Sequence, residues 1–215
     1  LIQSMNLLKK GKFKEGWKLY DKSLQIKDNY YPNIPFWKGE GLRKKKILVY
    51  EDQGIGDSIQ FSKFLFYLNK ICTDIRIEVR ESVVKLFQKN ILNLKIYKKD
   101  SNSSSDCDYK ISFASLNNFF YENKNKQEKK LFEIGQGTIL KWTKKITSKK
   151  LKVGLTWSGS LHGVNEPFRS IELDKLKKIL SLDCEFFCLQ KDIWERDKKY
   201  FRDSKINYLG DNNFL

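Results

Sequence analysis

The residues best suited to chemistry lie in a glycine turn, Gly54-Ile55-Gly56-Asp57, directly after the apolar run Lys46–Tyr50. Glycine has no Cβ, so Gly54 and Gly56 permit a tight turn and a close backbone approach. The residues that follow have helical periodicity, which places Asp57 beside the amide groups of a helix start. Open α/β sheets bind ligands at this place, the carboxyl end of a strand. The turn is therefore a candidate cleft turn.

The spacing of the residues in this turn limits the functions that can be assigned to it. The dinucleotide fingerprint requires a third glycine, and Ile59 occupies that position, so we do not predict NAD binding. Asp57 and Gln60 resemble a capping box with aspartate as the N-cap residue. From the spacing, a helix cap is favoured over a catalytic role for Asp57.

The elements around the turn alternate between strands and helices. Lys46–Tyr50 is short, apolar and rich in β-branched residues, as expected of a parallel strand buried on both faces. Such alternation indicates a parallel sheet. The predicted strands are Lys46–Tyr50, Asp74–Val79, Leu94–Tyr97 and Tyr109–Phe113, and the predicted helices are Phe61–Cys72 and Ser82–Lys89.

The same pattern starts again after a polar stretch, which predicts a second α/β domain. We expect Lys46–Tyr50 and Leu151–Trp157 to be central parallel strands of two separate sheets. The elements predicted for the second domain are a buried strand at Leu151–Trp157, a turn at Ser158-Gly159-Ser160, helices at Glu172–Leu180 and Ile193–Phe201, and strands at Cys184–Leu189 and Ile206–Leu209.

A pair of short helices precedes both domains. Leu1–Lys10 and Phe13–Ile26 are separated at Gly11, and the second helix carries Phe13, Trp17, Tyr20 and Leu24 on one face. The stretch LLKKGKFKEGWKLYDKSL resembles the last unit of a tetratricopeptide array, while a plain helical hairpin is the alternative. The predicted organisation is a hairpin at 1–27, a linker at 28–45, a first domain at 46–142, a linker at 143–150 and a second domain at 151–215.

The composition of the chain limits the kinds of partner that it is expected to bind. The net charge is +16, but lysine is spread along the chain and no RNA-binding motif occurs, so we interpret the charge as a solvated surface and do not expect nucleic acid. Four cysteines without a CxxC pair, and the single His162, give no basis for a zinc site. No apolar run of 18 residues exists, so we expect no membrane span, and without a signal-like start we expect a cytoplasmic protein.

Several segments resemble the bacterial tetratricopeptide-repeat glycosyltransferases, which are related to the heptosyltransferase-like enzymes. The family pattern EQGLGDTIQF corresponds to residues 52–61, with Asp52, Ile55 and Ser58 as departures. The family pattern WSGNPxHxNDxxRS corresponds to residues 157–170, where Ser160, Leu161 and Glu166 depart. Further likeness lies in GKFKEGWKLY, FFCLQKD and INYLGDNNFL, so the resemblance covers nearly the whole chain.

The resemblance implies a GT-B architecture, in which two Rossmann-like domains face each other across a cleft. It implies transfer of a sugar from a nucleotide-sugar donor to a hydroxyl of a glycan or protein acceptor, with no cofactor and no metal. Asp57 stands where the relatives place a proposed general base. The same resemblance assigns the donor and its phosphates to Ser158, Gly159, Ser160, His162, Asn165, Arg169, Gln190 and Lys191.

The family also has a segment like DTSVAHLAGALGKPVW that would follow the end of this chain. We therefore expect a fragment whose second domain is incomplete and which is inactive alone. A protein partner bound through tetratricopeptide repeats is a further expectation. The alternatives are a non-catalytic scaffold that joins helical repeats to a Rossmann-like domain, and a nucleic-acid binder, which steep salt dependence of binding would favour.

Overall fold

The structure is a computed structural model that describes residues 1–91, 94–101, 106–122, 132–159 and 169–210. It forms two compact units, residues 1–134 and 135–215. The division lies earlier than the sequence predicted, because the helix Gln136–Lys145 belongs to the second unit. The N-terminal helical pair belongs to the first unit and is not a separate body.

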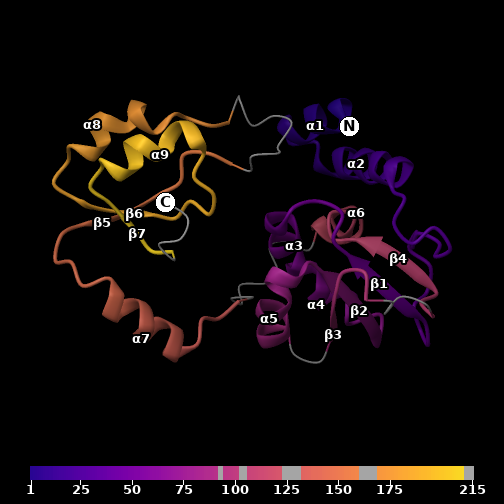
Figure 1. Ribbon diagram of the computed structural model, residues 1–215. Coiled ribbons are helices and arrows are strands. Elements are labelled where there is room, and N and C mark those ends of the chain that lie inside the picture. The colour runs from indigo at the N-terminus through magenta and orange to yellow at the C-terminus, as the bar shows by residue number, and fades with distance from the viewer. Residues whose placement is uncertain (92–93, 102–105, 123–131, 160–168, 211–215) are drawn as a thin grey trace. The chain divides into compact units, whose positions relative to one another are not determined.

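A four-stranded parallel sheet in the order β3-β2-β1-β4 forms the centre of the first unit (Figure 1). The central strand β1 pairs with β2 on one side and β4 on the other, as the sequence predicted for it. The strands are β1 (Lys46–Tyr50), β2 (Asp74–Val79), β3 (Lys95–Lys98) and β4 (Tyr109–Ser112). Strands connected by helices in this order make the unit Rossmann-like.

The helix after β1 begins earlier than predicted and is interrupted. Instead of one helix over 61–72, the chain forms α3, a 3-10 helix at Ser62–Phe64, and α4. The apolar spacing indicated the buried face correctly, but the start depended on turn geometry at Gly54. The α-helices after β1 in this unit are α3 (Ile55–Phe61), α4 (Leu65–Leu68), α5 (Glu81–Asn90) and α6 (Leu116–Phe120).

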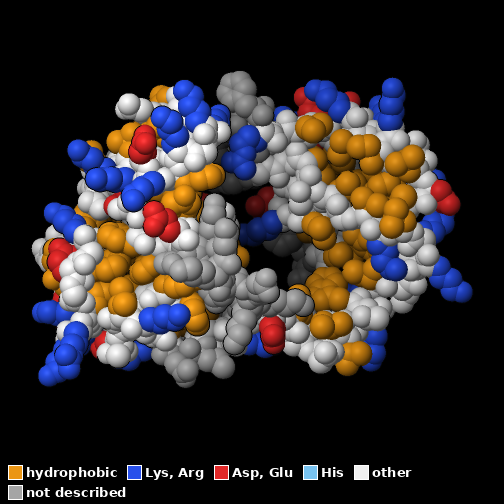
Figure 2. Space-filling model, turned by 180° about the vertical axis from the view of Figure 1, so that it is seen from behind, with side chains coloured by type: hydrophobic (Ala, Val, Ile, Leu, Met, Phe, Trp, Pro, Cys, Tyr) orange, Lys and Arg blue, Asp and Glu red, His pale blue; other side chains and the backbone are white. Residues whose placement is uncertain are grey.

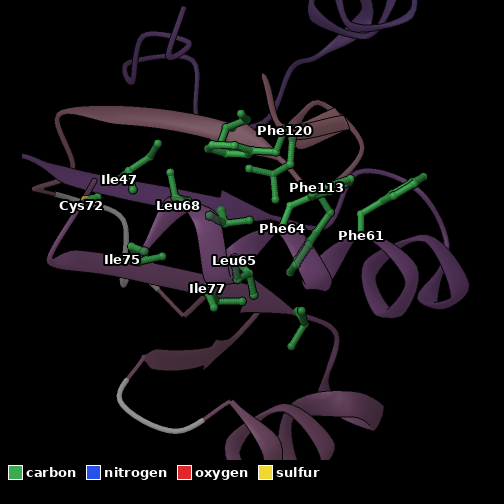
Figure 3. Close-up of a cluster of buried hydrophobic side chains, with 14 of the residues drawn as sticks. Ile47, Phe61, Phe64, Leu65, Leu68, Cys72, Ile75, Ile77, Phe113 and Phe120 are labelled. Carbon is green, nitrogen blue, oxygen red and sulfur yellow. The ribbon is translucent and has the colours of Figure 1, made fainter. Parts of the chain in front are cut away.

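The main hydrophobic core lies between one face of this sheet and the helices. Figure 3 shows Phe64, Leu65 and Leu68 against the strand residues Ile47 and Ile77. All five side chains are at most 2 % exposed. At about 1.5–3 kcal/mol for each fully buried large side chain, this face supplies much of the stability of the first unit.

The opposite face of the sheet is polar and is covered by residues 28–36, which we call the covering segment. Tyr50 of β1, Glu78 of β2 and Lys110 of β4 are all buried there. The Tyr50 hydroxyl donates a hydrogen bond to Asp28, and Lys110 Nζ lies 3.5 Å from the same carboxylate. Tyr31 of the predicted linker donates a hydrogen bond to Glu78, so the linker completes a buried polar network.

The helical pair packs against the same unit. The helices α1 (Ile2–Lys9) and α2 (Phe13–Lys27) are joined through Gly11, whose φ of 74° favours glycine. Trp17 of α2 packs edge-on against Phe61 of α3, with ring centroids 5.9 Å apart. The face of α2 predicted from its spacing is thus used within the first unit.

The second unit contains a three-stranded parallel sheet in the order β5-β6-β7. The prediction of separate parallel sheets is confirmed, but β6, not β5, is central among the described strands. The expectation that β5 is buried is also wrong, because its residues are exposed or half-buried. The strands are β5 (Lys152–Leu155), β6 (Glu185–Cys188) and β7 (Ile206–Tyr208).

The helices α8 (Lys177–Leu180) and α9 (Glu195–Arg202) cover one face of this sheet (Figure 1). The core there includes Leu173, Phe186 and Phe201. On the other face Leu189 is 60 % exposed, so the described elements bury mainly one face. The predicted helix 172–180 forms as a 3-10 helix at Leu173–Leu176 followed by α8. The α-helices of this unit are α7 (Gln136–Lys145), α8 (Lys177–Leu180) and α9 (Glu195–Arg202).

Lysine and arginine side chains are distributed over the visible face of both units in Figure 2, interspersed with apolar and acidic ones. This distribution matches the interpretation of the positive charge as a solvated surface. None of the described helices has the length and the apolar character needed to cross a bilayer.

Candidate functional site

Each unit has a candidate site at the carboxyl end of its strands, and the two are described separately. In the first unit the site is the turn between β1 and α3. In the second unit it is formed where β5, β6 and β7 end. Side chains and backbone groups converge at such edges because parallel strands finish there together.

Asp57 is fixed by reciprocal hydrogen bonds with Gly54. The Gly54 amide donates to Asp57 Oδ2 over 3.1 Å, and the Asp57 amide donates to the Gly54 carbonyl over 3.1 Å. Asp57 is therefore the third residue of the helix and Gly54 is its N-cap, which corrects the sequence interpretation of Asp57 as N-cap with Gln60 as its partner. Asp57 Oδ1 makes no hydrogen bond to another described residue, and the side chain is half-buried.

Glu51 and Arg80 form an ion pair that stabilises the turn between β1 and α3. The Glu51 carboxylate is 1 % exposed and accepts hydrogen bonds from the Arg80 side chain and backbone amide. Arg80 Nη2 also donates to the Gln53 carbonyl over 3.2 Å. One guanidinium thus joins the end of β1 to the turn, which holds the backbone ahead of Gly54 in position.

Asp52, which the sequence marked only as a departure from a family pattern, is a second carboxylate at this edge. Its Oδ1 atom is buried and has no hydrogen-bond partner among the described residues. Burial raises the pKa of the Asp52 carboxyl to about 6, although the nearby Gln53 and Ser112 act in the opposite direction. The pKa of Tyr20 is raised by burial and then by the charges of Asp52 and Asp57, and Tyr20 and Asp52 line the same cavity.

In the second unit, Gln190 holds the turn after β5. Its Oε1 accepts hydrogen bonds from the amides of Trp157 and Ser158 over 3.1 and 3.2 Å, and its Nε2 donates to the Ser158 carbonyl over 2.6 Å. Gln190 is 9 % exposed. Its amide is therefore used within the protein, and it positions the turn.

The amides expected to face a phosphate are also engaged. The Ser158 amide donates to Gln190, and the Gly159 amide donates to Ser170 Oγ over 3.3 Å. The Ser158 hydroxyl is different, because its oxygen is buried without a hydrogen-bond partner among the described residues. In this conformation the hydroxyl, and not these two amides, is the group of the turn left for a ligand.

Asp197 connects this turn to the helical layer. Its carboxylate is buried and accepts hydrogen bonds from Trp157 Nε1 and from the Leu173 amide, each over 3.0 Å. Satisfying both donors with one buried carboxylate fixes the end of β5 against α9. No local sequence pattern indicates this contact, because it joins residues 40 positions apart.

A pocket of about 400 Å³ lies where β6 and β7 end. Trp142 of α7 and Tyr208 of β7 supply aromatic walls, and Lys191 and Asp192 supply charges of opposite sign. Gln190 also borders this pocket. The aromatic pair was missed, because Trp142 was assigned to the end of the first domain and Tyr208 was interpreted only as part of a strand.

Three predicted donor-site residues, Ser160, His162 and Asn165, lie outside the described residues. Arg169 is exposed and makes no ion pair with another described residue.

The described residues contain no group of three or more histidine, cysteine, aspartate or glutamate side chains that could hold a metal ion. All four cysteines are free thiols, and Cys188 is buried in the core while Cys184 is half-buried.

Comparisons of the chain with models of known protein families, with curated proteins and with solved structures found no match.

Proposed function

We propose that the full-length protein is a glycosyltransferase that moves a sugar from a nucleotide-sugar donor to an acceptor hydroxyl. The observation that carries this proposal is the pocket at the ends of β6 and β7. Its volume of about 400 Å³ lies within the range of small-molecule sites. Trp142 and Tyr208 offer aromatic surface for a base, and Lys191 offers a positive charge for a diphosphate.

The buried turn beside the pocket supports the same assignment. Gln190 fixes the backbone around Ser158, so the hydroxyl of Ser158 is held in one place. A rigid hydroxyl donor can stabilise negative charge that grows on a leaving diphosphate. Arg169 follows eleven residues after Ser158 and is exposed, so its guanidinium can supply a bidentate contact.

In the proposed reaction Asp57 is the general base. As the acceptor oxygen attacks the anomeric carbon, its proton passes to Asp57 Oδ1, while Oδ2 remains bound to the Gly54 amide. The bond between the anomeric carbon and the donor's phosphate oxygen breaks, and the nucleoside diphosphate leaves with the electron pair. The acceptor is a glycan or a protein hydroxyl.

Titration calorimetry of the full-length protein with uridine, guanosine, adenosine and cytidine nucleotides tests this proposal. One nucleoside diphosphate should bind, and Arg169→Ala and Lys191→Ala should each weaken its binding by about 1.5–3 kcal/mol, the range for a hydrogen bond to a charged group. Arg202→Ala, an equally exposed arginine on α9, is the matched control and should have no effect. If no nucleotide binds, the non-catalytic scaffold becomes the better interpretation.

A further inference from the structure

A second cavity, of about 170 Å³, lies in the first unit at the carboxyl end of β1. Four parts of the chain line it: Leu1 ahead of α1, α2 with Tyr20 and Ser23, the covering segment with Asp28 and Tyr30, and the turn after β1 with Asp52. Because α2 forms one wall, the helical pair takes part in a site of the Rossmann-like unit.

Polar side chains that can accept hydrogen bonds line this cavity. The chain has a net charge of +16, yet no lysine or arginine lines the cavity. Asp28 is already engaged with the Tyr50 hydroxyl and with Lys110. Asp52 Oδ1, in contrast, is buried with no hydrogen-bond partner among the described residues. A buried acceptor left unpaired destabilises the folded chain, so a ligand that donates a hydrogen bond to it removes that cost.

The shape of the cavity sets the size of the ligand. A volume of about 170 Å³ is below the range of about 300–1,000 Å³ that suits drug-sized molecules, so the cavity fits a single ring. Tyr20, Tyr30 and Leu24 provide apolar and aromatic walls, while Ser23 and Gln53 add polar groups. Lys99 Nζ lies 4.1 Å from the centroid of the Tyr30 ring and so covers one face of it.

We propose that this cavity binds one neutral, hydroxyl-rich ring, a sugar unit, whose hydroxyls donate to Asp52. A carboxylate oxygen without a hydrogen-bond partner favours hydroxyl donors, and its charge disfavours phosphates. The identification of this ring as part of the acceptor rests on the proposed function, since Asp52 and Gln53 of the cavity wall belong to the same turn as Asp57. The binding of the ring itself does not depend on a donor or on turnover.

Saturation-transfer NMR with glucose, galactose, mannose and N-acetylglucosamine, in the absence of nucleotide, tests the site. At least one sugar should show transfer, and Asp52→Asn should weaken its binding at least about tenfold. Ser23→Leu should fill the cavity and abolish binding. Asp100→Asn and Ser82→Leu, both at exposed positions of the same unit, are the matched controls and should bind like the parent chain.

Melting temperatures of all four variants establish that each is folded before binding is compared. The proposal is overturned if none of the four sugars binds, if folded Asp52→Asn and Ser23→Leu bind as tightly as the controls, or if glucose 6-phosphate binds better than glucose. Because no nucleotide is present, such a failure leaves the donor pocket of the second unit untouched. Conversely, failure of nucleotide binding would refute the proposed function and leave this sugar site standing.

Discussion

Asp57 supports the start of a helix and is also the proposed general base. Its two carboxylate oxygens serve these two roles separately. Oδ2 holds the Gly54 amide, while Oδ1 has no partner among the described residues. A helix-supporting carboxylate in this position is also oriented for catalysis. The structural role needs only an acceptor oxygen, which asparagine provides, whereas proton abstraction needs the carboxylate.

Asp57→Asn in the full-length protein should therefore remain folded and lose activity. We expect a loss of at most about 1 kcal/mol of stability, the size of a charge effect at a helix start. Turnover should fall by roughly 10²–10⁴-fold, the usual contribution of a general base, while nucleotide binding is retained. Melting temperature, calorimetry and a sugar-transfer assay measure these three quantities. Glu81→Gln, which changes the acidic first residue of α5, is the control. Normal turnover of Asp57→Asn would remove Asp57 from the mechanism.

Asp52 gives a prediction about stability and pH. Its folded pKa of about 6 lies above the ordinary value of 3.8, so the folded state binds the proton more tightly than the unfolded state. The stabilisation from this proton is complete below pH 3.8 and is lost as the pH rises through 6. Tyr20, Asp28 and Tyr50 are the neighbouring titratable groups.

Asp52→Asn should consequently be more stable than the parent chain at pH 7.5, since it removes a buried charge. Its advantage should shrink by about 1–2 kcal/mol between pH 7.5 and pH 5, where the parent chain regains the proton. Urea denaturation at both pH values measures the difference. The same comparison with Asp100→Asn, at an exposed position, should show no such change. An advantage that is constant with pH would contradict the raised pKa.

At the scale of elements, the contact between α1 and α2 depends on one glycine. A Cβ atom at Gly16 would lie 2.7 Å from Leu8 Cδ2 and 3.1 Å from the Leu8 backbone nitrogen. The two helices therefore approach closely at this point, and a side chain would separate them. Gly137, also within a helix, has no atom within 4 Å of its Cβ position.

Substitution by alanine should lower the stability at Gly16 and raise it at Gly137. Gly16→Ala should destabilise the first unit by about 1–3 kcal/mol, as overpacking does, despite the better helix propensity of alanine. Gly137→Ala should stabilise α7 by up to about 1 kcal/mol, because only the propensity changes. Circular dichroism during denaturation measures both effects. Equal stabilisation by both substitutions would show that α1 does not pack closely on α2.

At the scale of the whole molecule, the two units have separate hydrophobic cores. Phe64 is 1 % exposed in the first core, and Phe186 is 2 % exposed in the second. Residues that share no partners contribute additively to stability. Damage to one core should therefore leave the other unit protected.

Phe64→Ala and Phe186→Ala should each cost about 3–5 kcal/mol in their own unit. Hydrogen exchange followed by mass spectrometry should show lost protection in β1, β2 and β4 for the first variant, and in β5, β6 and β7 for the second. Each variant serves as the control for the other. Loss of protection throughout the chain in either variant would mean that the two units unfold together.

The sequence by itself determined the alternation of strands and helices. The ranges predicted for β1 and β2 are those observed, because short apolar runs between turn residues are local signals. It also determined that the chain forms two parallel sheets. It located Gly54, Gly56 and Asp57 at the end of β1, since that placement needs only the order of neighbouring residues.

Only the tertiary structure decided which groups remain for a ligand. Gln190 and Ser158 are 32 residues apart, and Asp28 and Tyr50 are 22 apart, so no local pattern reports that these side chains are bound to each other. The cavity beside Asp52 likewise needs α2, the covering segment and the turn after β1 together. Burial and hydrogen-bond pairing are set by contacts between distant segments, whereas periodicity records only which face of an element is apolar.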